Sequence, residues 1–132
     1  VYGTATLATI RSDVEKLADE LGVEVEFFQT NGEGELVEKI HQAADRFDGI
    51  VINPGGLTHY SVVLLDAILA VELPCVEVHL TNLAGREEFR HRSVIAAAAA
   101  GRVEGFGPVG YRLALTGLVE LLNEKKGGTK KN

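Results

Sequence analysis

The stretch GIVINPGGLTH at residues 49–59 and the stretch CVEVHLTN at residues 75–82 decide the fold class of this chain. In the first stretch, a β-branched apolar run breaks into a glycine loop. In the second, an alternating run ends on a histidine, His79. Both patterns are typical of strands followed by loops. In open parallel sheets, ligands bind outside the carboxyl ends of the strands, so we expect the two stretches to contribute to one site.

The composition indicates one globular domain. The chain has 132 residues, of which 45% are hydrophobic and 24% are charged. Its formal net charge of -6 argues against nucleic acid as the main partner, because binding to a phosphate backbone needs a basic face. The single cysteine, Cys75, lies in an apolar run and favours a buried thiol in a reducing compartment. No apolar run approaches the roughly 20 residues that span a bilayer, so we expect a cytoplasmic protein without a membrane partner.

Helical and strand periodicities alternate along the chain. They predict helices over residues 7–21, around 36–44, over 61–71 and over 110–125, and strands over residues 23–27, 50–53, 76–79 and 102–106. Strands separated by helices indicate βαβ units, and hence an α/β three-layer sandwich with a parallel sheet. We expect residues 1–125 to form a single domain and residues 126–132 a flexible tail.

The order of these elements is unusual at its start, since a helical pattern comes before any strand. Doubly wound folds of this size open with a central strand, in the sheet order 2-1-3-4-5. In that order the opening strand lies between the strands expected at residues 23–27 and 50–53, and its absence would leave backbone groups unpaired. We therefore expect the first strand to come from a segment upstream of Val1.

Polar side chains gather at or just beyond the strand ends: Asn53, His59, His79, Arg86 and Arg90. Histidine titrates near neutrality, arginine neutralises a carboxylate, and asparagine both donates and accepts hydrogen bonds. Such a set suits acid–base chemistry on an anionic small molecule, although a strand-end histidine with satisfied hydrogen bonds would show the same spacing. Glu77 lies on the same strand face as His79, where it could orient the imidazole or pair with a nearby cation.

Other chemical signals are weaker. The histidines and the single cysteine lack zinc spacing, so we expect no metal site. The stretch GFGPVG at residues 105–110 matches the dinucleotide pattern GxGxxG, but it follows the last strand. We interpret its glycines as allowing a helix to pack closely on the sheet. Ser61 does not lie in a GxSxG motif, so serine nucleophile chemistry is unsupported.

Six short motifs, taken in order, together resemble one known family. They are VYG at residues 1–3, GELV at 34–37, IH at 40–41, NPGGLTH at 53–59, VEVH at 76–79 and REEFR at 86–90. The resemblance, which covers essentially the whole chain, is to type II 3-dehydroquinate dehydratase. It implies a flavodoxin-like fold and a lyase that needs no metal or organic cofactor. The implied reaction is an anti elimination of water from the anion 3-dehydroquinate, giving 3-dehydroshikimate through an enolate.

The resemblance assigns the proton-transfer roles to three residues. Tyr2 matches the general base that removes the proton beside the ketone, and His79 matches the general acid that protonates the departing hydroxyl. Glu77 matches the carboxylate that orients His79. The same reaction serves both the shikimate pathway of aromatic amino acid biosynthesis and the breakdown of quinate.

The resemblance also implies how the substrate is held. The backbone N–H groups of Leu80 and Thr81 match the pair that binds the substrate carboxylate. Asn53, His59 and Arg90 match groups that bind the ring hydroxyls or position the ring.

Two further residues match positions at the border of the family's site. Arg86 matches a residue beside the active-site lid, and Asp66 matches a residue that reaches across a trimer interface toward a neighbouring site. Members of the family assemble as dodecamers of four trimers, so we expect a homo-oligomer.

The lid and its activating arginine would come before Val1 in this family, as would the first strand. We therefore expect this polypeptide alone to have little activity. Two other functions stay open. One is a small-molecule binding or regulatory domain that has kept the pocket but is inactive. The other, by analogy of fold, is a flavin or nucleotide carrier.

Overall fold

The structure, a computed structural model, describes the backbone of residues 6–131 and the side chains of residues 6–126. Its helices are α1 (Leu7–Leu21), α2 (Glu33–Ala43), α3 (Val62–Val71) and α4 (Val109–Lys131), and its strands are β1 (Ile50–Ile52), β2 (Cys75–His79) and β3 (Gly101–Glu104). In the described part of the chain the three strands form one parallel sheet in the order β1-β2-β3. The predicted α/β class and parallel sheet are confirmed.

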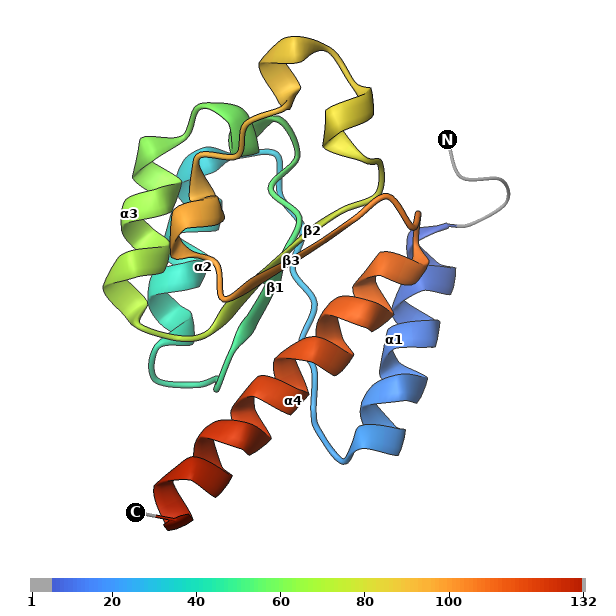
Figure 1. Ribbon diagram of the computed structural model, residues 1–132, viewed down its shortest axis with the longest axis vertical. Helices are drawn as coiled ribbons and strands as arrows, with labels where there is room; N and C mark the ends of the chain where they lie inside the picture. Colours follow the sequence, from blue (N-terminus) through green and yellow to red (C-terminus); the bar gives the residue numbers. More distant parts are fainter. Residues whose placement is uncertain (1–5, 132) are drawn as a thin grey trace.

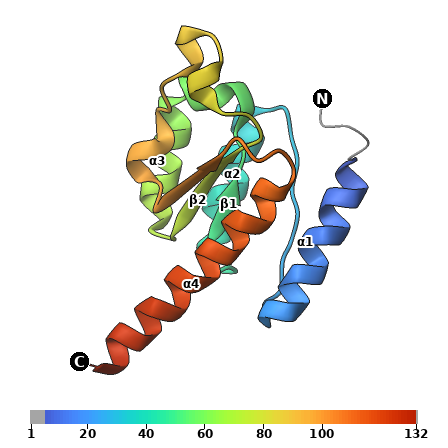
Figure 2. The same cartoon turned by 45° about the vertical axis from the view of Figure 1, so that its right-hand side comes forward.

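Helices cover both faces of the sheet (Figures 1 and 2). Side chains alternate between the faces of a strand, and β2 shows this clearly. Its Cys75 packs in the cluster that includes Leu64 and Ile68 of α3, whereas its Val76 and Val78 pack against α4. Helix α1 lies outside α4 and packs against it. The result is a layered arrangement with the sheet in the middle.

The helix ends follow from local sequence. Helix α1 begins after Thr6, whose side chain accepts a hydrogen bond from the backbone N–H of Thr9 at 3.1 Å. It ends at Leu21 and is followed by Gly22, which adopts the left-handed conformation with φ 74°, as expected of a C-terminal glycine. Helix α3 begins in the same way after Ser61, whose hydroxyl accepts from the N–H of Leu64 at 3.0 Å.

The structure assigns no strand over residues 23–27, where one was predicted, because the segment forms no ladder among the described residues. The predicted alternation is nevertheless present. Val23, Val25 and Phe27 pack toward α1 and α4, and Glu24 and Glu26 are exposed. The segment runs as a pale blue trace beside α1 in Figure 2. Alternation records which side chains are buried, but a strand also requires a neighbouring strand to pair with, and this segment pairs with no strand among the described residues.

The last helix is longer than predicted. Helix α4 begins at Val109 and continues to Lys131, so residues 126–131, expected to form a tail, extend its backbone. At its start, a Cβ added to Gly110 would lie 3.1 Å from a methyl carbon of Val78. A side chain there would crowd the sheet, which supports the interpretation of this glycine as a close-packing position. Within the described residues, the structure has no helix that is long and apolar enough to cross a membrane.

The hydroxyl of Ser61 fixes the start of α3 through two hydrogen bonds. It accepts from Leu64 and donates to the Glu33 carboxylate at the start of α2, and Ser61 is buried. We expect Ser61→Ala to lower the free energy of unfolding by about 1–2 kcal/mol, measured by urea denaturation. The control is Thr116→Ala, which removes an exposed hydroxyl on α4 and should change the value by less than about 0.5 kcal/mol. Equal losses in the two variants would contradict this role.

Candidate functional site

A cleft of about 180 Å³ opens at the carboxyl ends of β1 and β2. Its wall is made by the last residue of β2 and by the loops that follow the two strands: Asn53, Gly55, Gly56, His59, His79, Leu80, Thr81, Leu83, Arg86 and Arg90. The two stretches expected to form one site therefore do meet in one place. This is the arrangement expected of parallel strands, whose carboxyl ends lie at the same edge of a sheet.

Two of the predicted site residues in the described part of the chain do not lie on this wall. Glu77 is fully buried beneath it and reaches the cleft only through His79. Asp66 is exposed on α3, outside the cleft. Tyr2 lies outside the described residues.

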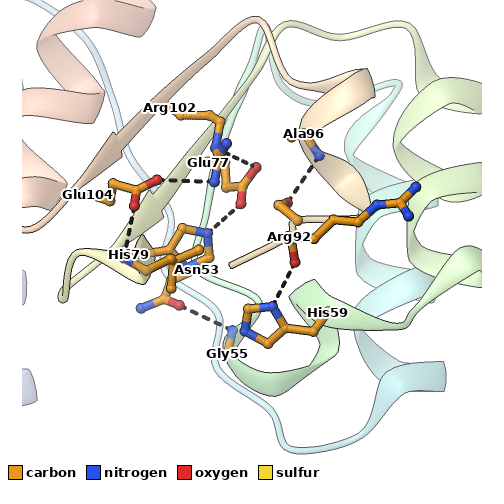
Figure 3. Close-up of polar contacts among 11 residues, drawn as sticks. Asn53, Gly55, His59, Glu77, His79, Arg92, Ala96, Arg102 and Glu104 are labelled. Atoms are coloured by element: carbon orange, nitrogen blue, oxygen red, sulfur yellow. Dashed lines mark hydrogen bonds and ion pairs between the residues drawn. The ribbon is translucent and has the colours of Figure 1, made fainter. Parts of the chain in front are cut away.

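Glu77 and His79 form a buried pair at the end of β2. Both side chains leave the same face of the strand, and His79 is only 4% exposed. The ring Nε2 of His79 hydrogen-bonds to the Glu77 carboxylate (Figure 3). Since an ionised carboxylate can only accept, Nε2 carries the proton, and Nδ1 is the ring nitrogen left for a ligand.

The surroundings of Glu77 favour its ionised form. Burial by itself raises the pKa of this carboxyl group, but hydrogen bonding by His79 and Ser93 and the charges of His79 and Arg102 outweigh it. The net result is that the pKa of Glu77 lies below its ordinary value of 4.5. Glu77 is therefore an anion that holds the imidazole in one orientation over a wide pH range.

Two charged residues of β3 complete this group, and the sequence analysis did not single them out. Arg102 places its Nε 3.5 Å from Oε1 of Glu77 and its Nη2 3.0 Å from Oε2 of Glu104. The other oxygen of Glu104 accepts the backbone N–H of Leu83 at 2.9 Å. The sequence did contain a signal for this group: Arg102 and Glu104 are two charged residues, two positions apart, on the strand expected next to β2.

On the other side of the cleft, hydrogen bonds fix Asn53. Its side-chain NH₂ donates to the hydroxyl of Tyr111 on α4 at 2.9 Å, and its carbonyl accepts from the N–H of Gly55 at 3.2 Å. His59 is held by a contact of 2.8 Å between Nδ1 and the carbonyl oxygen of Arg92. Both side chains are thus oriented without any ligand.

The loop after β2 supplies the positive charge of the cleft. Arg86 donates to the hydroxyl of Thr81 at 3.1 Å. The carboxylate of Glu87 lies 3.4 Å from Nε of Arg86 and 3.2 Å from Nε of Arg90. Two guanidinium groups on one wall make the cleft suitable for an anion. In the described part of the chain, no group of three His, Cys, Asp or Glu residues is placed to hold a metal ion.

The fold and the cleft together define a parallel α/β domain with a hydrogen-bonded carboxylate–imidazole pair at its strand ends, beside a wall that carries two arginines. The family model described as "Dehydroquinase class II" matches residues 1–119, and the chain belongs to this family. The resemblance recognised in the sequence is therefore confirmed.

Curated relatives and solved structures agree with this assignment. A protein of Desulforudis audaxviator named 3-dehydroquinate dehydratase is 55% identical over 126 residues, which cover 96% of this chain and 84% of that protein. One of Bacillus cereus with the same name is 50% identical over 124 residues, covering 94% of this chain and 85% of its own. The crystal structure of type II dehydroquinase from Propionibacterium acnes matches with a TM-score of 0.85 at 43% identity, covering 91% of this chain and 83% of that one.

The lowered pKa of Glu77 gives a prediction for stability. A carboxyl group with a lower pKa in the folded protein stabilises the fold above its unfolded-state pKa, and this stabilisation is lost as pH falls through the folded-state pKa. We expect the free energy of unfolding to decrease as pH falls below about 4.5, and to decrease less in Glu77→Gln. Urea denaturation at a series of pH values measures this.

The control for this measurement is Glu120→Gln, a change of the same kind at an exposed position of α4. It should keep the pH dependence of the unchanged protein. If Glu77→Gln and Glu120→Gln showed the same dependence, Glu77 would not be the group responsible.

Proposed function

We propose that the chain catalyses the anti elimination of water from 3-dehydroquinate, giving 3-dehydroshikimate through an enolate. Membership of the class II dehydroquinase family makes the chain a hydro-lyase, and the relatives named 3-dehydroquinate dehydratase are 50% to 55% identical to it. The single observation that carries the chemistry is the buried Glu77–His79 pair opening into a cleft with two arginines on its wall.

In this proposal His79 is the general acid. An imidazolium at the cleft wall can give its proton to the departing hydroxyl, which leaves as water. Glu77 supports this step in two ways. It fixes the ring so that Nδ1 faces the substrate, and it accepts the hydrogen bond from Nε2, so that the proton given to the substrate leaves from Nδ1.

Tyr2 is the proposed general base, on the strength of the family motif alone. It would take the proton beside the ketone, leaving the enolate. A free phenol has a pKa of about 10, so the base needs nearby positive charge to act at neutral pH.

The proposed substrate contacts use the rest of the wall. The backbone N–H groups of Leu80 and Thr81, which follow β2, would hold the substrate carboxylate. Arg86 and Arg90 would add positive charge on the same side. Asn53 and His59, across the cleft, would bind the substrate's ring hydroxyls. Arg90 would help to bind these hydroxyls or to position the ring.

We also propose the flavodoxin-like sheet order 2-1-3-4-5. In this order the segment at residues 23–27 is an edge strand, and one further strand lies in the sheet between it and β1. Two observations support it. In the described part of the chain, β1 pairs only with β2. The segment at residues 23–27 has the alternating burial of a strand without a ladder partner.

The exposed face of α3 supports the proposed homo-oligomer of trimers. Val62, Val63 and Leu69 are each more than half exposed, at 58%, 54% and 56%. Asp66 is exposed on the same helix. Apolar side chains gathered in this way are typical of a surface that another protein chain covers. From this face Asp66 could reach the cleft of a neighbouring subunit.

Turnover tests the reaction directly. We expect the protein to produce enone absorbance from 3-dehydroquinate. His79→Ala should lower kcat by about 10²–10⁴-fold, the usual contribution of a general acid. Tyr2→Phe should abolish turnover. The matched control is His41→Ala, which removes an exposed histidine of α2 and should leave kcat unchanged. Equal turnover in the unchanged protein and in His79→Ala would exclude His79 as the acid.

Light scattering tests the assembly. We expect Leu69→Glu to lower the particle mass to that of a smaller species, because a buried charge at the interface would be unpaired. Leu7→Glu is the control, since Leu7 is 57% exposed on α1, away from α3. This variant should keep the mass of the unchanged protein. An unchanged mass in Leu69→Glu would show that this face of α3 is not the interface.

A further inference from the structure

Building on the proposed hydro-lyase function, we propose that Arg102 is a positioning residue for the Glu77–His79 pair. We further propose that Glu104 holds Arg102 in place and links it to the cleft wall at Leu83. Neither residue belongs to the motifs that carry the family resemblance.

The register of the sheet brings these four side chains together. Glu77 is the cross-strand partner of Arg102, and His79 is the partner of Glu104. Residues two apart on a strand share a face, so all four side chains leave the sheet on one side. The contacts run from His79 to Glu77, then to Arg102 and then to Glu104, so that carboxylates alternate with cationic or protonatable side chains. Arg102 lies between Glu77 and Glu104 (Figure 3).

Glu77 needs a second partner besides His79. Its side chain is 0% exposed, and only Oε2 bonds to His79. Among the described residues, Oε1 has no hydrogen-bond partner, and the guanidinium of Arg102 lies 3.5 Å away. A buried carboxylate is unfavourable unless opposite charge is close. Arginine suits this role because it stays charged at every pH at which the enzyme would work.

The guanidinium of Arg102 must itself be fixed in position if it is to stabilise the charge of Glu77. Its side chain is 36% exposed, and a long side chain at a surface loses conformational entropy when it is fixed. The 3.0 Å contact to Glu104 supplies the anchor. Because Glu104 also accepts the N–H of Leu83, which lines the cleft, the same carboxylate connects the support of the acid to the wall of the cleft.

The other groups that face Glu77 do not replace Arg102. On its own strand Glu77 has His79 and Cys75, and the pKa of the Cys75 thiol is raised to about 12 by burial and by the charge of Glu77. Cys75 is therefore neutral at working pH. Ser93, from the loop before β3, contributes a hydroxyl without charge. Arg102 is thus the only permanent cation among these groups.

The test compares Arg102→Gln with Arg102→Lys, which keeps the charge. Loss of the cation should make Glu77 easier to protonate, so the acidic limb of the kcat profile should move to higher pH. At the optimum we expect kcat to fall by roughly 10-fold, part of the ~10²–10⁴-fold that general acid catalysis supplies. KM should change much less, since Arg102 does not line the cleft. Arg102→Lys should restore most of the profile.

Arg46→Gln is the matched control. It removes a guanidinium that pairs at 3.1 Å with Glu26 on the surface, and it should leave the profile unchanged. The proposal would be overturned if Arg102→Gln behaved like Arg46→Gln. It would also be overturned if kcat fell equally at every pH and Arg102→Lys failed to rescue it, since this would indicate a purely structural role.

A second measurement needs no turnover. The carboxyl ¹³C resonance of Glu77, assigned with Glu77→Gln, reports the pH at which this group is protonated. Arg102→Gln should raise that midpoint, whereas Arg46→Gln should not. If the unchanged protein failed to convert 3-dehydroquinate but this shift occurred, the proposed function would fail and the positioning role would stand. An unshifted midpoint would overturn the positioning role.

Discussion

The chain places an ionised carboxylate, Glu77, in the middle of its sheet, and the rest of the site depends on how that charge is accommodated. Transfer of a lone carboxylate into a protein interior is strongly unfavourable, and the usual response is protonation. Here the pKa is lowered instead, because His79 and Ser93 interact with the group and Arg102 faces it. The same contacts that make the buried charge tolerable also fix the imidazole at the edge of the cleft.

This accommodation requires the parallel pairing of β2 with β3. The pairing sets Arg102 opposite Glu77 and Glu104 opposite His79, so a shift of one residue would turn the β3 side chains to the other face of the sheet. Close packing of α4 on the opposite face supports the register, with Gly110 allowing the helix to approach Val78. The geometry of the Glu77–His79 pair is thus set by packing on the opposite face of the sheet.

Local patterns predicted the helices and the three paired strands well, because apolar periodicity and end signals such as Gly22 depend only on neighbouring residues. The cleft could also be predicted, since polar residues that follow parallel strands must meet at one edge. The missing ladder at residues 23–27 could not be predicted, because the pairing of a strand depends on a partner distant in sequence. The contacts of Arg102 and Glu104 were missed for a related reason. The cross-strand register places these two residues beside Glu77 and His79, and the sequence of one segment does not determine this register.

The distribution of charge places positive groups at the cleft of an acidic protein. The chain has a formal net charge of -6, yet two arginines line the cleft. Glu87, which is exposed and does not line the cleft, lies within 3.4 Å of Arg86 and 3.2 Å of Arg90. Glu104 anchors Arg102 in the same way behind the Glu77–His79 pair. In both places a carboxylate outside the cleft holds an arginine whose positive charge is needed nearby. Some of the negative charge of this protein therefore fixes the positions of its cations, and the geometry of the site does not have to be assembled by the ligand.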